Sequence, residues 1–331
     1  MVLVMIAKIT FPETERGRKE IIIRKINSVH IESGWKRLTD TAIIKLPRNA
    51  NYFKDGLKKV TVNKVKETFK KGDPVKIELG YNGNYVTEFE GYITHVSADI
   101  PIVIKCEDAM YLLKKQAVNV SLPNASLEEL LVTILPGYDI DALEVEIGAQ
   151  RFPKTTVAKV LQKLKDDYSL FNYMKGKQLV CGKVYADDTE LVPIKLHLEK
   201  NVVNNDLNYK NKEDVIIRIN AVSTLKNGDK IEVTIGDETG EERQLTYYGI
   251  EIEAELTKLA KEDLKKYKVD GFTGSVKCYG IPVINHGNKI ELTSDLYDDR
   301  NGVYYVEETI VDFTDTAEFR RKIQLGDKVT T

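Results

Sequence analysis

Histidine, cysteine and acidic residues could hold a metal or act as catalysts, and in this chain they are scattered. The four histidines stand alone, and none has a second ligand at the short spacing that zinc sites use. We therefore interpret each as an ordinary core or surface histidine. They are His30, His95, His197 and His286.

One acidic stretch has some of the residues of a calcium loop. Asp139 and Asp141 are followed by Glu144 and Glu146, and carboxylates are ligands that calcium prefers. An EF-hand loop needs a ligand at its fifth position, where this chain has Leu143, and its glycine at a place that this stretch does not provide. We interpret the stretch as a solvated acidic loop, and we predict neither a metal nor a cofactor.

No combination of residues predicts catalysis. The chain lacks a Gly-x-Ser-x-Gly nucleophile motif, a Walker loop and a Gly-x-Gly-x-x-Gly turn after a strand. Glu107 and Asp108 could be considered as a glycosidase pair, but adjacent residues on a strand point to opposite faces. The cysteines are odd in number and lack Cys-x-x-Cys spacing, which indicates reduced thiols in an intracellular protein. These cysteines are Cys106, Cys181 and Cys278, and we predict that the protein is not an enzyme.

The strongest basic feature is the lysine-rich stretch from Lys54 to Lys71. It holds seven lysines against two acids, with Phe69 as its aromatic residue. Single-strand binding needs a basic groove with several aromatic platforms, and the paired tyrosines of the chain lie near acids instead. We interpret the stretch as a solvated helix face, or as an electrostatic partner for the acidic segment 232–255 on a neighbouring subunit. The net charge of −2 gives no general attraction to nucleic acid or to a membrane surface.

The elements that carry these residues fall into three parts, of which residues 1–115 are the first. This part has five or six short β-prone runs, including a clean alternation over Val75–Gly80. Asn82 and Gly83 have the signature of a tight hairpin turn. Short strands at this spacing predict a first small barrel or sandwich.

Residues 116–190 change character and predict a small α+β domain. Ser126 and Glu129 form a capping box, and the helix that they open ends at Pro136. A second helix begins near Thr155, with apolar residues at helical spacing on one face. A hairpin follows over residues 171–181.

Residues 191–331 return to β structure. A helix over 253–267 interrupts them, and the segment 271–325 then alternates turns with short strands, as small β-barrels do. The predicted fold class is therefore β-rich α+β, with two small β-barrels and an intervening small α+β domain. The barrels span 1–115 and 191–331, and the second includes the helix 253–267.

Length and composition agree with a multidomain globular protein. A chain of 331 residues with 42% hydrophobic and 30% charged residues can bury more than one core. The apolar start, Met1–Ala7, is too short for a signal peptide or a spanning helix, and no later run approaches 18 apolar residues. We expect a protein that is made in the cytoplasm.

Two stretches of this chain resemble the baseplate hub proteins of contractile-tailed phages. The first runs from Gly80 through Phe89–Ile93 to the segment Ile104–Leu113, which contains Cys106-Glu107-Asp108. The second is the segment 271–325, with its Arg300-Asn301-Gly302 turn and the closing Phe319-Arg320-Arg321 run. In style the chain is most similar to Mu-type tail hub proteins, the late control D group. It is more loosely similar to the hub part of T-even phages and to type VI secretion spike proteins.

This resemblance implies a trimeric structural protein without catalytic activity. Two similar barrels in each of three chains would form a ring of approximate six-fold symmetry. Such a ring adapts a six-fold tail tube to a three-fold spike, and DNA can pass through it without specific binding. The implied partners are tail tube and spike or baseplate proteins, and the implied location is the virion tail baseplate.

The candidate subunit-interface residues come from the lysine stretch, the acidic segment and the closing arginines: Lys58, Lys59, Lys70, Glu241, Glu242, Arg320 and Arg321. Two other functions stay open at this point. One is a hub or spike of a type VI or related contractile injection system. The other is a barrel protein that binds glycans or single-stranded nucleic acid.

Overall fold

The structure is a computed structural model that describes residues 3–47, 51–54, 58–61, 68–97, 99–183, 192–225, 227–316 and 318–329. For residues 51–54, 58–61 and 299 the description covers the backbone. In the described part, no helix is both long and apolar enough to cross a membrane.

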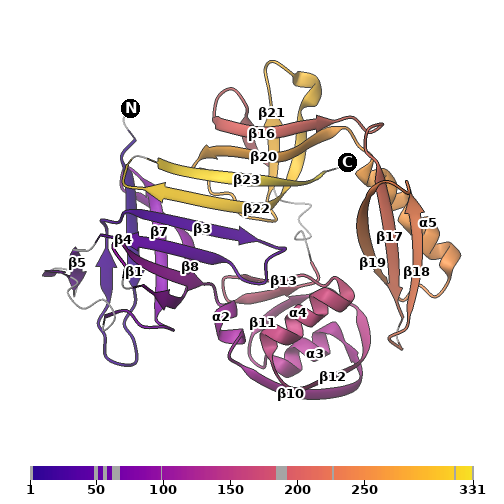
Figure 1. The fold of residues 1–331 in the computed structure, drawn as a ribbon, viewed down its shortest axis with the longest axis horizontal. Helices are drawn as coiled ribbons and strands as arrows, with labels where there is room; N and C mark the ends of the chain where they lie inside the picture. The colour runs from indigo at the N-terminus through magenta and orange to yellow at the C-terminus, as the bar shows by residue number, and fades with distance from the viewer. Residues whose placement is uncertain are drawn as a thin grey trace.

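A single 15-stranded sheet takes strands from both ends of the chain (Figure 1). Its main path runs in the order β16-β20-β23-β22-β3-β4-β9-β8-β7-β1-β2-β5-β6, and the parallel pair β15–β21 joins it at β22. The N-terminal strands are β1 (Met5–Phe11), β2 (Ile21–Ile23), β3 (Ser28–Gly34), β4 (Thr41–Leu46), β5 (Asn51–Lys54), β6 (Lys58–Thr61), β7 (Pro74–Tyr81), β8 (Asn84–Val96) and β9 (Ile102–Glu107). The C-terminal strands are β15 (Ile194–His197), β16 (Val202–Lys210), β20 (Gly271–Tyr279), β21 (Lys289–Thr293), β22 (Gly302–Thr314) and β23 (Glu318–Lys328).

The two β parts are joined, which corrects the prediction of two separate barrels. β22 pairs with β3 from Glu308 opposite Gly34 to Thr314 opposite Ser28, so the sheet crosses from one end of the chain to the other. Among the described residues the pairing path is open, with β16 and β6 as its ends, and no closed barrel is found. The physical reason is that β22 is 13 residues long, so that it pairs with β21 at one end and with β3 at the other.

The apolar core of the N-terminal strands includes residues from both sides of the predicted boundary at residue 191. Val311, Phe313 and Phe319 from β22 and β23 pack into the core that β1, β3, β4 and β7 to β9 build. A second core lies under β15, β20, β21 and the other halves of β22 and β23. Strand alternation accounts for both cores, because successive side chains of one strand point to opposite faces.

The hairpin turn and the middle helices form as their local signals predict. β7 and β8 are joined at Asn82 and Gly83, which have φ of 51° and 92°, values that a two-residue turn of this kind requires. Ser126 Oγ accepts a hydrogen bond of 3.1 Å from the amide of Glu129 and caps α3 (Leu127–Ile134). In α4 (Val157–Tyr168) the residues expected on one face are buried in the middle core.

The middle module lies below the sheet in Figure 1 and has its own core. α3 and α4 are accompanied by the short helix α2 (Met110–Leu113) and by five strands. β10 (Ala117–Ser126) pairs with β12 (Glu146–Thr156), and β14 (Gln178–Cys181) pairs with both β11 (Asp139–Ala142) and β13 (Asn172–Lys175). The acidic stretch predicted as a loop is thus partly the strand β11, because it pairs in parallel with β14.

A third unit holds the helix that we assigned to the second barrel. α5 (Glu253–Tyr267) packs on a separate sheet of β17 (Ile217–Thr224), β18 (Lys230–Gly236) and β19 (Glu241–Tyr248), at the right of Figure 1. This unit is inserted between β16 and β20, which pair with each other. The helix therefore buries its apolar face on this local sheet, through Leu256 and Ala260, and the assignment to a barrel is wrong.

The helix reading of the lysine stretch is wrong for its first part, which lies in β5 and β6, whereas Thr68 is helical and residues 62–67 lie outside the described residues. β5 and β6 form an antiparallel hairpin, with Lys54 opposite Lys58. Phe69, which we considered as a stacking platform, is 1% exposed and packs on Phe11 with ring centroids 4.5 Å apart. The first part of the stretch is β structure because β5 also pairs with β2 and extends the sheet.

Candidate functional site

The candidate catalytic and metal-binding residues do not form a site. Among the described residues, no three His, Cys, Asp or Glu side chains are grouped so that they could hold a metal ion. All three cysteines are buried, and burial raises the pKa of each thiol, to about 11 at Cys278. Asp141 instead pairs with Lys183 at 2.6 Å.

A buried ion pair joins β8 to β23. One guanidinium nitrogen of Arg321, Nη2, lies 2.7 and 2.9 Å from the two carboxylate oxygens of Glu88. Both side chains are almost fully buried, at 1% and 2% exposed. The guanidinium also donates to the carbonyls of Ile284 and Gly280 at 3.1 Å each. Burial raises the pKa of Glu88 although Arg321 opposes this shift.

A β-bulge places Glu88 in this pair. Ile77 lies opposite Phe89 while Glu78 lies opposite Thr87, so Glu88 is the extra residue of β8. A bulge turns the chain locally and re-aims a side chain. The predicted role of Arg321 at a subunit interface is therefore wrong, because its charge is already paired in the interior of its own chain.

A surface network crosses the junction of β3 and β22. His30 Nδ1 lies 2.7 Å from Asp312 Oδ1, and its Nε2 lies 3.1 Å from Glu32. Arg37 then bridges Glu32 and Glu308 at 2.5 and 2.7 Å. Partial burial lowers the pKa of His30, but the hydrogen bonds and charges of Asp312 and Glu32 outweigh it and raise the pKa.

We expect His30→Gln to remove a pH-dependent part of the stability. A raised histidine pKa stabilises the folded state fully below the unfolded value of 6.5, and this contribution is lost as pH rises through the folded pKa. Because the side chains are more than a third exposed, the effect should stay below about 1 kcal/mol. Urea denaturation of both proteins on either side of neutral pH measures it. Equal differences in unfolding free energy between the two proteins at both pH values would contradict the expectation.

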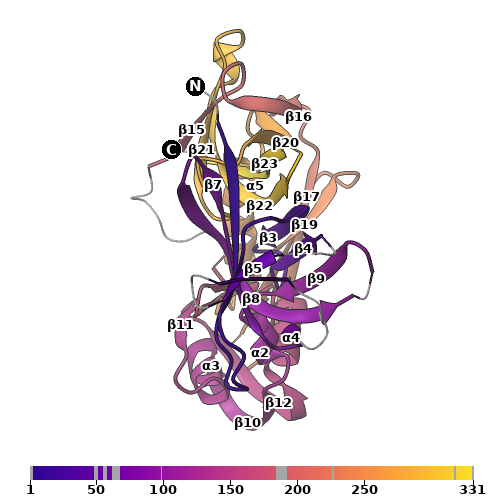
Figure 2. The same cartoon turned by 90° about the vertical axis from the view of Figure 1, so that its left-hand side faces the viewer.

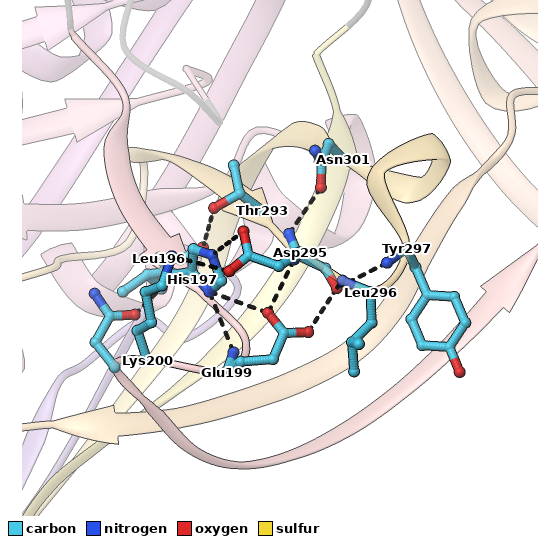
Figure 3. Close-up of polar contacts among 11 residues, drawn as sticks. Leu196, His197, Glu199, Lys200, Thr293, Asp295, Leu296, Tyr297 and Asn301 are labelled. Atoms are coloured by element: carbon cyan, nitrogen blue, oxygen red, sulfur yellow. Dashed lines mark hydrogen bonds and ion pairs between the residues drawn. The ribbon is translucent and has the colours of Figure 1, made fainter.

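A second polar cluster lies where the parallel strands β15 and β21 end (Figure 3). His197 stands between two carboxylates, with Nδ1 3.0 Å from Glu199 Oε2 and Nε2 3.0 Å from Asp295 Oδ1. Lys200 also contacts Asp295 at 3.0 Å. The hydrogen bond from Ser294 is the main cause of a lowered pKa at Glu199, and contacts with Lys200 and His197 lower the pKa of Asp295.

The bonding of Ser294 indicates a structural role for this cluster. Its hydroxyl donates to Glu199 Oε1 at 2.6 Å and accepts from the amides of Leu296 and Tyr297 at 3.1 Å each. The hydroxyl therefore faces a carboxylate and two amides, and not the imidazole that would have to activate a nucleophile. The cluster holds the loop that follows β21.

That loop presents apolar side chains at one end of the molecule. Leu296 is 73% exposed and Tyr297 is 51% exposed. Arg300 lies over the rings of both Tyr297 and Tyr209, at 4.5 and 5.1 Å from their centroids. The loop lies at the opposite end of the molecule from the middle module in both overall views (Figures 1 and 2). A loop held in this way is a surface suited to contact another protein, because its geometry is fixed before binding.

The remaining candidate interface residues lie apart from one another. Lys70 is exposed, and Glu241 and Glu242 are exposed at the start of β19 in the inserted unit. Arg320 is partly buried and covers the ring of Tyr279 at 5.0 Å. The side chains of Lys58 and Lys59 lie outside the described residues. Within the described chain the basic and acidic groups do not meet, so an electrostatic contact between subunits stays a prediction.

Sequence reasoning missed Glu88 and Asp312, whose partners are distant in the chain. One signal was present: Phe319, Arg321 and Ile323 alternate on β23, and alternation places Arg321 on the same inward face as its apolar neighbours. The bulge that turns Glu88 inward has no comparable signal. Neither the family models nor the curated proteins contain a match to this chain.

Solved structures with the same fold are found over nearly the whole chain. A tail protein from Neisseria meningitidis MC58 has a TM-score of 0.63 at 14% identity, covering 98% of this chain and 96% of its own. The 43 kDa tail protein of prophage MuSo2 from Shewanella oneidensis has a TM-score of 0.59 at 15% identity, covering 98% and 97%. A component of the E. coli type VI secretion system, itself described as similar to two T4 tail proteins, has a TM-score of 0.52 at 10% identity, covering 92% and 73%. The chain thus has the fold of phage tail proteins.

Proposed function

We propose that this chain is a structural baseplate hub protein of a contractile phage or prophage tail, without catalytic activity. The observation that carries the proposal is the likeness to two tail proteins over 98% of this chain. The scattered histidines and cysteines and the bonded Ser294 are in keeping with a structural role. The protein would be made in the host cytoplasm and act in the virion tail.

The proposed assembly is a homotrimer that forms a ring of approximate six-fold symmetry. Such a ring would adapt the six-fold tail tube to the three-fold spike. Among the described residues the main sheet ends at β16 and β6 without a further strand, which supports an assembly because unpaired strand edges are a hazard unless another element covers them. A ring needs heterologous contacts that close, and two different edges at the ends of one sheet are of that kind.

Light scattering of the purified protein and electron microscopy test this function. We expect three times the monomer mass at micromolar concentration, and particles in ring-shaped end views. A stable monomer without rings would contradict the proposed assembly. Pull-down of tail tube or spike proteins from the same genome tests the partners separately.

The electrostatic contact between subunits makes a distinct prediction. Changing Lys58, Lys59 and Lys70 to Glu should weaken the trimer more at low salt than at high salt, because salt screens exposed charges. Changing Glu241 and Glu242 to Lys in the same protein should restore it if these groups meet. Sedimentation at two ionic strengths measures both effects, and a trimer that the first change leaves intact at low salt excludes the contact.

The second candidate is a hub or spike of a type VI or related injection system. The likeness to the E. coli type VI component supports it, at a lower TM-score than the two tail proteins. Neighbouring genes separate the two functions, because tail tube and tape-measure genes would flank a phage hub. No observation favours binding of glycans or single strands, since the hydroxyls of Tyr247 and Tyr248 already bond to Asp263 and to the carbonyl of Tyr168.

A further inference from the structure

The loop over residues 35–40, between β3 and β4, docks the sheet onto the middle module. Trp35, the single tryptophan of the chain, is 7% exposed and contacts Phe171 edge-on, with ring centroids 4.7 Å apart. It shares a small core with Tyr173 and Val180 of β13 and β14. Leu38 packs against the core of the middle module, and Lys165 of α4 donates to the carbonyl of Lys36 at 2.9 Å.

Two acidic residues close the base of this loop. The carboxylate of Asp40 accepts from Ser33 Oγ at 2.6 Å and from the amide of Gly34 at 3.1 Å. Asp108, 8% exposed, accepts from the amides of Met110 at 3.0 Å and Asp40 at 3.3 Å. The amide of Asp108 in turn donates to the carbonyl of Asp40 at 3.1 Å. The two residues thus hold the end of β3, the start of β4 and the start of α2 together.

Little positive charge offsets these two carboxyls. Burial raises the pKa of Asp40 to about 6, with Arg37 lowering it and Glu308 raising it. Burial and the charge of Asp40 raise the pKa of Asp108 to about 8, against a lowering by Lys114. Lys114 is itself paired with Glu107 at 2.7 Å, and Arg37 with Glu32 and Glu308.

The basic groups on the other side of the loop do not neutralise Asp40 and Asp108 either. Lys36 pairs with Glu307 of β22, and Lys165 bonds to a backbone carbonyl. His286 contacts the ring of Tyr173 at 4.8 Å, and burial lowers its pKa to about 4, so it is neutral above that pH. Charge that develops on the two carboxyls at rising pH is therefore offset only in part, by hydrogen-bond donors and by cations that have other carboxylate partners.

We propose that Asp40 and Asp108 form a proton-operated latch between the sheet and the middle module. With a proton on the pair, the loop over residues 35–40 stays docked. When both carboxyls are ionised, they repel each other at a junction where Asp108 is buried and Asp40 is partly buried, and the loop opens. The latch lies within one chain, between the sheet and the middle module, and does not depend on the proposed function.

The direction of the effect follows from proton linkage. A carboxyl whose pKa is raised by docking stabilises the docked state fully below the ordinary value of 3.8. This stability is lost as pH rises, and the loss ends near the docked value of about 8 for Asp108. Between its ordinary and its docked pKa each group weakens docking about tenfold per pH unit, so Asp40 acts up to about pH 6 and Asp108 up to about pH 8.

Hydrogen exchange of the loop tests the latch in the intact protein. The Arg37 amide donates to the carbonyl of Gly34 at 3.0 Å and is protected while the loop is docked. We expect its protection factor, which is corrected for the intrinsic pH dependence of exchange, to fall about tenfold or more from about pH 6 to about pH 8. It should change little at higher pH. Trp35 emission, followed in parallel, should move to longer wavelength as the loop opens.

The variants decide which groups are responsible. Asp108→Asn keeps an acceptor for the Met110 amide but cannot ionise, and it should abolish most of the fall in protection. Asp40→Asn is the second variant and should act in the same direction. His30→Gln is the control, because His30 lies on the same sheet and also titrates, and it should leave the fall unchanged. The latch is overturned if the protection factor of the wild-type protein does not change between about pH 6 and about pH 8. It is also overturned if the logarithm of the protection factor falls at least half as much in Asp108→Asn as in the wild-type protein.

Discussion

Glu88→Ala is expected to lower the free energy of unfolding by about 3 to 5 kcal/mol, because it leaves the Arg321 guanidinium buried without its counter-charge. The side chain of Arg321 is 1% exposed, so the charge cannot reach water without opening the sheet. Two carbonyls at 3.1 Å would remain as its partners. Denaturant unfolding monitored by circular dichroism measures the loss.

Glu90→Ala provides the matched control for this prediction. Glu90 is two residues away on the same strand, and it pairs with Lys76 at 3.1 Å while being 59% exposed. An exposed pair of this kind contributes about 0 to 1 kcal/mol. Glu88→Gln should fall between the two alanine variants, since it keeps a hydrogen-bond acceptor but not the charge. If Glu88→Ala and Glu90→Ala unfold at the same denaturant concentration, the buried pair does not hold the two β parts together.

The second large effect is expected for Phe319→Ala, at about 3 to 5 kcal/mol of lost stability. Phe319 is fully buried near the end of the chain, yet it belongs to the core built mainly by residues 7–106. Its ring lies 5.2 Å from that of Tyr81 and 5.7 Å from that of Phe313. The cavity left by the ring would therefore open at the seam between the two ends of the chain.

Two further variants separate packing at this seam from general damage to the sheet. Tyr279→Ala removes a ring of similar size that is 43% exposed on β20, and it should cost much less than Phe319→Ala. Gly280→Ala should also lower the stability, but by overpacking and not by a cavity, because a Cβ there would lie 2.3 Å from the Phe319 ring. Equal unfolding midpoints for Phe319→Ala and Tyr279→Ala would contradict the packing proposed for this seam.

Local patterns were sufficient for the elements that depend on neighbours in the chain. The Ser126 cap of α3, the apolar face of α4 and the Asn82-Gly83 turn are present as predicted. Each is decided by backbone conformation and by hydrogen bonds over a few residues. The absence of catalytic spacing and the resemblance to tail proteins were likewise visible in the residues alone.

The pairing of strands that are distant in the chain could not be predicted from the sequence, and this explains the wrong predictions of two separate barrels and of the position of α5. Alternation tells which side chains of a strand point inward, but the backbone groups at its edge are the same whichever strand lies beside it. Nothing local therefore indicates that β22 pairs with β3, and two separate barrels were predicted. The helix α5 was placed in a barrel for the same reason, although its apolar face is satisfied by three strands next to it.

The residues that could do chemistry illustrate the same division. Spacing along the chain was enough to show that the histidines, cysteines and paired acids form no catalytic motif, because that property is local. Their actual roles depend on the folded chain: His30 and Arg321 join its two ends, and Asp40 and Asp108 meet beneath a loop. The physical reason is that burial and charge set these roles, and both depend on residues that lie as many as 282 positions away.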